Sequence, residues 1–134
     1  MKSRGIGLFL SLFILLLVSS CATVPKEPLG PGDLRLTAVE FPEFGGMKKN
    51  VKYLAHIKFE GDGRPEIPRA CFYWGISGPF CINVMDVNYG TQIARIDVPT
   101  PQDGMYRFQV FVYYIRDGRN VRSNTVETSV TVVP

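Results

Sequence analysis

The sequence predicts an all-β protein, a single antiparallel sandwich of seven strands that follows an N-terminal leader. From residue 33 onward, apolar residues alternate with polar ones, as in strands that bury one face. No stretch of that region shows the 3.6-residue apolar period of a helix. Glycine and proline clusters interrupt the alternation at short intervals and mark turns. About 100 residues patterned in this way suffice for one domain with its own core.

The first twenty residues are expected to form a signal peptide that precedes this domain. Lys2 and Arg4 come before an apolar run over residues 6–18. As a helix that run would span about 20 Å, too little to cross a hydrocarbon core about 30 Å thick. A basic start followed by a short apolar run is typical of a secretory signal peptide.

The segment that ends the leader, Val18-Ser19-Ser20-Cys21, resembles the lipobox of bacterial lipoproteins, which the type II signal peptidase cleaves. The resemblance implies that Cys21 receives a diacylglyceryl group and becomes the N-terminus of a membrane-anchored envelope protein. Ala22 follows, where many lipoproteins retained in the inner membrane have aspartate. The resemblance therefore implies the outer membrane, with the domain facing the periplasm or, alternatively, displayed at the cell surface.

A tether is expected between the lipidated cysteine and the domain. The segment contains Pro25, Pro28 and Pro31 and almost no apolar residues. In a largely extended, proline-stiffened state it would reach roughly 34 Å. We therefore expect the signal peptide at 1–20, the lipidated cysteine and tether at 21–32, and the domain at 33–134.

The first four strands are separated by clear turn signals. The first ends before Gly45-Gly46, and the second has the strictest alternation, with Val51 and every second residue to Phe59 facing the core. Glycines and prolines between residues 61 and 68 break the chain before the third strand. A glycine-containing turn at 75–78 then leads into the fourth strand, which returns beside the third.

The remaining strands are delimited in the same way. Pro99, Pro101 and Asp103-Gly104 form the corner before the sixth strand, and Asp117-Gly118 is the turn of the last hairpin. In order, the seven strands are expected at residues 34–41, 51–59, 70–74, 79–87, 91–98, 106–115 and 121–133.

Several residues resemble those of immunoglobulin-like and fibronectin-type-III-like domains. Trp74 lies where such domains place the tryptophan of their third strand, and Tyr106 resembles the tyrosine corner before the sixth. Residues 112–124 are similar to the last hairpin of many bacterial immunoglobulin-like repeats. The resemblance covers residues 33–134 and implies the fold but no function. Ala55 and Phe108 stand where antibody domains carry their disulfide.

The two cysteines left after lipidation, Cys71 and Cys81, are predicted to form a disulfide, because disulfides persist in exported proteins. Alternation turns both side chains outward on neighbouring strands, within bridging reach. A redox or metal pair is the alternative, but the spacing differs from that of a thioredoxin-like motif and no histidine lies nearby.

Alternation also turns aromatic and apolar side chains outward on the same sheet. If the residues flanking them face the core, four side chains form an exposed patch beside the disulfide: Tyr73, Phe111, Tyr113 and Ile115. Such patches often bind partners, although a covering loop or ordinary apolar surface would also account for them.

The remaining residues give little support for a catalytic or metal-binding site, so we expect no catalytic residues, metal or cofactor. His56, the only histidine, is expected to be a solvated residue on an outer face. Glu60, Asp62 and Glu66 could hold calcium only weakly, because their spacing differs from that of an EF-hand loop. Ser77 lies in a turn without a credible base.

The charge of the chain excludes a nucleic-acid partner. Lys2 and Arg4 belong to the leader, so two of the 15 basic residues are removed and the rest nearly balance 12 acidic ones. We therefore predict a lipoprotein whose domain is a non-catalytic protein-interaction or structural module with an envelope protein as its partner. The alternative is a module that binds glycan or peptidoglycan through exposed aromatic rings.

Overall fold

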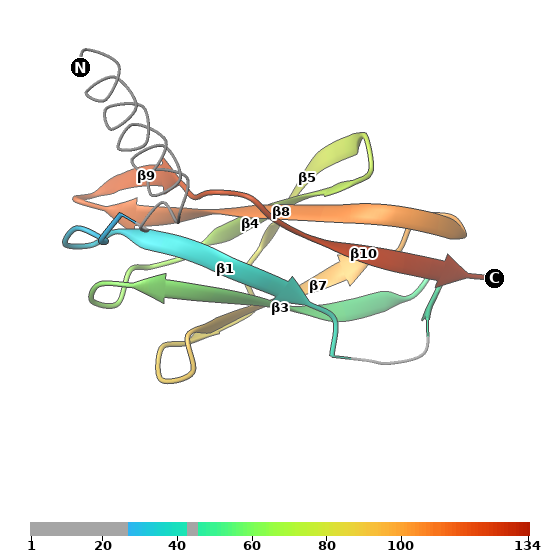
Figure 1. Ribbon diagram of the computed structural model, residues 1–134, viewed down its shortest axis with the longest axis horizontal. Helices are drawn as coiled ribbons and strands as arrows, with labels where there is room; N and C mark the ends of the chain where they lie inside the picture. Colours follow the sequence, from blue (N-terminus) through green and yellow to red (C-terminus); the bar gives the residue numbers. More distant parts are fainter. Residues whose placement is uncertain (1–26, 43–45) are drawn as a thin grey trace, which may run out of the picture.

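A computed structural model describes residues 27–42 and 46–134 of the chain. The expected signal peptide, Cys21 and much of the expected tether lie outside these residues. The described chain consists of strands and connecting turns, which confirms the all-β class (Figure 1). None of its described segments is a helix long and apolar enough to span a membrane.

The smaller of the two sheets has four strands, all of them antiparallel to their neighbours. It contains β1 (Leu34–Glu40), β3 (Lys52–Gly61), β7 (Ile93–Pro99) and β6 (Asp86–Asn88), in that spatial order. Adjacent strands pair over nearly their full lengths, except that the short edge strand β6 pairs with only part of β7.

The larger sheet has six strands, five of them in one continuous row. Its only parallel pair among the described strands joins β2 to β10, and β9 pairs with the far end of β8. In spatial order it contains β2 (Met47–Lys48), β10 (Val126–Val133), β8 (Gly104–Arg116), β4 (Arg69–Trp74) and β5 (Ser77–Asn83), with β9 (Arg119–Arg122) beside β8.

The two sheets enclose one apolar core, the arrangement of a β-sandwich. The inner faces of β3 and β8 supply its centre, and Ile57, Phe108 and Val110 are all fully buried, as the alternation predicts. Val51, which was expected in the core, is 42% exposed, so that prediction is wrong. It precedes β3 and lies at the rim, where its backbone carbonyl accepts a hydrogen bond from the Thr100 amide at 3.1 Å.

The prediction of seven strands is wrong because the domain has ten in the described residues. The expected strand 79–87 divides into β5 and β6, which belong to different sheets. The change of sheet occurs between two consecutive residues. Val84 N–H donates to the Pro68 carbonyl at 3.1 Å, whereas Met85 N–H donates to the Arg95 carbonyl of the other sheet at 2.9 Å.

The expected strand 121–133 also divides, into β9 and β10, at Ser123 and Asn124. Ser123 Oγ accepts a hydrogen bond from Val112 N–H at 2.9 Å. The Asn124 amide makes two bonds with the Leu36 backbone of β1, accepting at 2.8 Å and donating at 2.9 Å. The side chain thus links the two sheets at this break. The short β2, which the sequence does not predict, is the third additional strand.

Trp74 and Tyr106 pack against each other at one end of the sandwich, with ring centroids 5.7 Å apart. The Trp74 ring packs on Phe108, with centroids 4.8 Å apart, and its Nε1–H donates to the Pro99 carbonyl at 3.1 Å. Tyr106 Oη donates to the carbonyl of Gln102, four residues before it, at 2.8 Å. These bonds fix the loop between β7 and β8 against β4.

Candidate interaction surfaces

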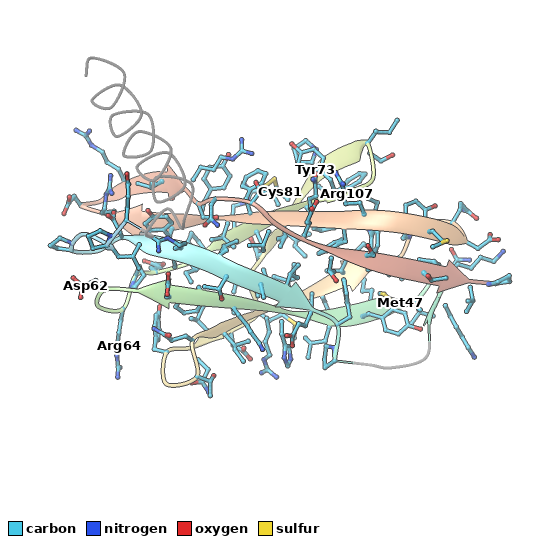
Figure 2. The ribbon with its side chains drawn as sticks, viewed as in Figure 1. Met47, Asp62, Arg64, Tyr73, Cys81 and Arg107 are labelled. Atoms are coloured by element: carbon cyan, nitrogen blue, oxygen red, sulfur yellow. A yellow bond between two sulfur atoms is a disulfide. The ribbon has the colours of Figure 1, made fainter. Side chains whose placement is uncertain are left out.

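The Cys71–Cys81 disulfide is present and joins β4 to β5. The two cysteines are direct partners in the β4–β5 register, with an S–S distance of 2.07 Å. The two differ in burial, because Cys71 is fully buried whereas Cys81 on the edge strand is exposed. Cys81 and Tyr73 both lie at this hairpin (Figure 2). The disulfide therefore links the edge strand β5 covalently to β4.

The expectation that Phe111 is exposed is wrong, since the residue is only 2% exposed. It faces outward, directly opposite Cys71 across the β4–β8 pair, but its neighbours cover it. The Arg122 guanidinium lies 3.8 Å from the ring centroid, in cation–π geometry. The rings of Tyr73 and Tyr113 lie 6.4 and 5.7 Å away, between centroids. Phe111 is thus the centre of a second, small apolar cluster.

The other members of the predicted patch, Tyr73, Tyr113 and Ile115, are half-buried. The structure brings the tyrosines together around Phe111, and Ile115 lies further along the same face of β8. The sequence prediction misses Arg122 as the residue that covers Phe111, although the turn before β9 could have indicated it. A two-residue turn at Asp117-Gly118 sets the β8–β9 register and places Arg122 opposite Tyr113.

The surface that the sequence does not predict is an apolar groove beneath the β4–β5 hairpin. Its volume is about 870 Å³, and no charged side chain is among its lining residues. Phe80 faces the same side as its partner Phe72 but is 49% exposed, because β5 is the last strand of its sheet. Six residues define the groove here: Trp74, Pro79, Phe80, Ile82, Pro101 and Tyr106.

Exposed apolar side chains are frequent in and just after the β4–β5 hairpin, and one of them, Phe80, lines the groove. Five large ones are exposed in the described residues, and three of them, Ile76, Phe80 and Met85, lie in or just after the β4–β5 hairpin. The hairpin projects beyond the body of the sandwich (Figure 1). An apolar surface gathered on one projecting element is typical of a site that contacts another molecule.

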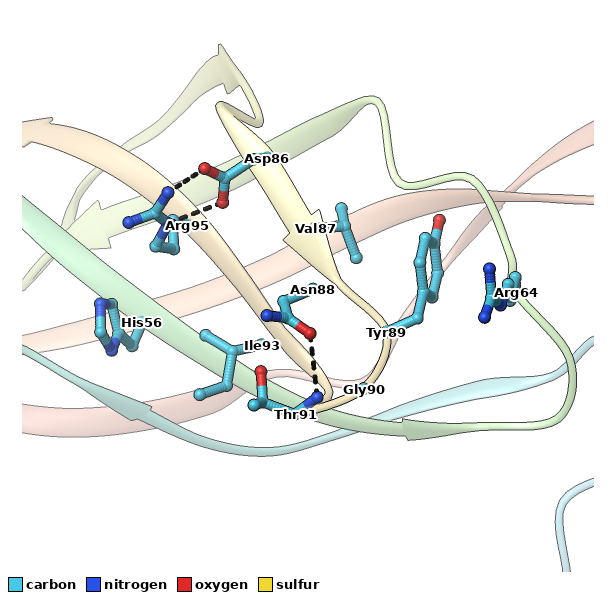
Figure 3. Close-up of a pocket in the computed structure, with 10 residues that line it drawn as sticks. All are labelled: His56, Arg64, Asp86, Val87, Asn88, Tyr89, Gly90, Thr91, Ile93 and Arg95. Carbon is cyan, nitrogen blue, oxygen red and sulfur yellow. Dashed lines mark hydrogen bonds and ion pairs between the residues drawn. The ribbon is translucent and has the colours of Figure 1, made fainter.

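A polar hollow of about 610 Å³ lies over the outer face of the smaller sheet (Figure 3). Glu40, His56, Arg95 and Asp86 are successive partners across β1, β3, β7 and β6. His56 is half-buried in this row, on the outer face as predicted. Arg95 Nε donates to Asp86 Oδ1 at 2.6 Å, so these two charges neutralise each other.

The Asp86–Arg95 pair should contribute to stability only above acidic pH. The hydrogen bond from Arg95 lowers the pKa of the Asp86 carboxyl. A lowered pKa in the folded state stabilises the protein above the ordinary aspartate pKa, and this contribution disappears as the pH falls through the lowered value. We expect Asp86→Asn to lose less stability than the native chain between neutral pH and about pH 3, measured by urea denaturation.

The matched control for this prediction is Asp62→Asn, which changes an exposed aspartate that forms no ion pair among the described residues. Asp62→Asn should lose as much stability as the native chain over the same pH range. Identical acid dependence in Asp86→Asn and the native chain would contradict the prediction. The effect should be small, because exposed ion pairs are well solvated.

The weak calcium site considered for Glu60, Asp62 and Glu66 gains no support. Glu60 accepts a hydrogen bond from Arg35 at 3.0 Å. Across residues 27–42 and 46–134, no group of three or more acidic, histidine or cysteine side chains is arranged to hold a metal ion. These carboxylates are ordinary surface groups in the described structure.

The groove and the Phe111 cluster are therefore the two candidate surfaces, and the groove has the more exposed apolar residues. Both belong to the larger sheet, on its inner and outer faces respectively. Comparisons of the chain with protein-family models, with curated proteins and with solved structures find no match.

Proposed function

We propose that this protein is a lipid-anchored envelope lipoprotein whose domain binds another protein and catalyses no reaction. The observation that carries the proposal is the uncharged groove beneath β4–β5, with Phe80 exposed at its wall. The centres of protein interfaces are depleted in charged residues and enriched in aromatic ones. The lining of this groove has the same composition. The lipobox supports anchoring through Cys21, and Ala22 supports the outer membrane, with the domain facing the periplasm or, alternatively, displayed at the cell surface.

We also propose that the sandwich is immunoglobulin-like. The strand order β1-β3-β7-β6 matches the A-B-E-D sheet of such domains, and β10-β8-β4 matches the G-F-C sheet. The positions of Trp74 and Tyr106 support the same assignment. On this assignment β5 is an additional edge strand next to the third strand, so the groove lies beside an element that the basic fold does not require.

Binding of glycan or peptidoglycan is the second candidate function. The groove offers the half-buried ring of Tyr106 and the exposed ring of Phe80 beside the polar groups of Ser77, Thr100 and Gln102. Ring faces can stack on sugars, and hydroxyl and amide groups can bind sugar hydroxyls. The half-buried Tyr73 and Tyr113 provide fewer free ring faces, because both pack against Phe111.

Partner capture tests the proposed protein-binding function. After mild detergent extraction, the native chain should co-purify with a stoichiometric protein, and Phe80→Glu should lose it, because a charge would enter an apolar interface. Met105→Glu is the matched control, since Met105 is 86% exposed but does not line the groove. Retention of the native chain on purified peptidoglycan with no bound protein would favour the second function instead. Equal capture by both variants would contradict the proposed site.

Lipid anchoring at Cys21 is tested separately from partner binding. Cys21→Ser should fold normally but move from the membrane fraction to the soluble fraction, because several acyl chains are needed for firm attachment. Incorporation of labelled palmitate measures the modification directly. Label in the Cys21→Ser protein would contradict lipidation at this residue, and an intact Cys71–Cys81 disulfide would show that the variant is folded.

A further inference from the structure

The edge strand β5 is only partly protected against pairing with another strand. It pairs only with β4 among the described strands, and its sequence, Ser77 to Asn83, contains no charged residue. Natural edge strands are commonly protected by charged side chains, prolines or bulges. Here Pro79 lies near the beginning of the strand, and the segment from Phe80 to Asn83 has none of these features.

The register shows which backbone groups of β5 face the free edge. The Cα atoms of Cys71 and Cys81 are 4.1 Å apart, as in the closely spaced pairs whose N–H and C=O groups point away from each other. Two hydrogen bonds after β5 show the same alternation of backbone groups. Val84 N–H points towards the β4 side and bonds to the Pro68 carbonyl, whereas Met85 N–H points away from it and bonds to the Arg95 carbonyl. The N–H and C=O groups of Cys81 and Asn83 therefore point to the free edge.

We propose that β5 pairs antiparallel with β5 of a second copy of this chain, across a two-fold axis at Cys81. In this register Cys81 faces Cys81 of the second copy, and the two residues exchange both backbone hydrogen bonds. Asn83 faces Pro79 of the second copy, whose carbonyl accepts the Asn83 N–H. Pro79 has no N–H, so the pairing leaves no donor unmatched there.

The side chains of this register are self-complementary. Phe80 faces Ile82 of the second copy on the groove side, and by symmetry Ile82 faces Phe80 of the second copy. Both side chains line the groove in each copy, so pairing would join the two grooves into one apolar surface. β5 has no charged side chain, so no charges of like sign meet along the paired strands. The pairing therefore lacks the charge repulsion that commonly keeps edge strands apart.

This inference rests on the proposed protein-binding function and identifies its partner as a second copy. Anchoring also favours it, because lipid chains would hold both copies at one membrane surface and raise their effective concentration. A two-fold axis perpendicular to that surface would place both N-termini on the same side.

Photo-crosslinking of the full chain in intact cells tests the inference. With benzoylphenylalanine in place of Phe80, illumination should give a product of twice the monomer mass, in which mass spectrometry finds the probe joined to the peptide containing Ile82. The same probe at Met105 is the control and should give little of this product, because Met105 does not line the groove. A product with a different protein would overturn the second copy as partner but leave the proposed function intact. No protein product from Phe80 would overturn both.

A pair of variants tests the register itself. Phe80→Glu and Ile82→Lys should each abolish dimers of the detergent-extracted chain, since each sets a charge against an apolar side chain. When the two tagged variants are co-expressed, mixed dimers should exceed either homodimer at least tenfold, because the two charges become direct partners. Co-expression of Phe80→Glu with Met105→Lys is the control and should give no rescue. Failure of the first mixture, with both disulfides intact, would overturn this register.

Discussion

Replacing Phe111 with alanine should lower the free energy of unfolding by about 3–5 kcal/mol, although the residue lies on the outer face of its sheet. Phe111 is 2% exposed and is enclosed by Arg122, Tyr73 and Tyr113. Truncation would remove the centre of this cluster and leave a cavity that backbone pairing prevents from collapsing. Urea denaturation, with the slope of the transition unchanged, measures the loss.

Ile115→Ala is the matched control, because it truncates a half-buried residue on the same face of β8. It should cost roughly 1 kcal/mol, the usual effect away from a packed core. Arg122→Ala should cost about 0.5–2 kcal/mol, since it removes the cation–π contact and uncovers the ring. A loss below about 1 kcal/mol for Phe111→Ala would show that the residue behaves as ordinary exposed surface.

The sequence predicts the parts of the fold that depend on local pattern. Strict alternation assigns the inner faces of β3 and β8 correctly, because side chains on neighbouring strand residues must point to opposite faces. Turn chemistry locates the hairpin at Asp117-Gly118 and the corner before Tyr106. The cysteine count and the export signal together predict the Cys71–Cys81 disulfide.

The strand count was wrong where the backbone changes its partner without a turn signal. Val84 and Met85 are both apolar, and no glycine or proline separates them, yet their N–H groups bond to different sheets. Alternation indicates which way a side chain points but not which strand the backbone joins. At Asn124 the break is held by a side-chain amide that bonds to β1, a contact between residues far apart in the sequence.

The candidate site was only partly predictable for the same reason. Alternation correctly turns Phe111 outward, but burial depends on what crosses above it, and Arg122 comes from the next strand. The groove combines β4, β5 and the loop after β7, which only the folded topology brings together. Alternation with Cys81 places Phe80 on the same face as Phe72, but the exposure of its ring follows from the edge position of β5.

Removal of the disulfide by the double substitution Cys71→Ala and Cys81→Ala should lower stability by about 2–3 kcal/mol on the chain-entropy account. The ten-residue separation gives a short loop, which places the effect at the lower end of the range for disulfides. The double substitution is needed because a single one would leave a free thiol. Thiol titration of the native chain should find no free sulfhydryl at Cys71 or Cys81 before reduction.

The loss should be concentrated in β5 rather than spread over the domain. β5 has a neighbour on one side only, and most of its side chains are exposed, so the disulfide is a large share of what holds it to β4. Hydrogen exchange should therefore show reduced protection for the Phe80 and Ile82 amides, which face β4, while buried β3 amides such as that of Ile57 stay protected. Equal loss in β5 and β3 would mean that the disulfide stabilises the whole sandwich. In that case the edge strand would be an integral part of the cooperative fold, and its apolar face would be less free to rearrange around a second strand.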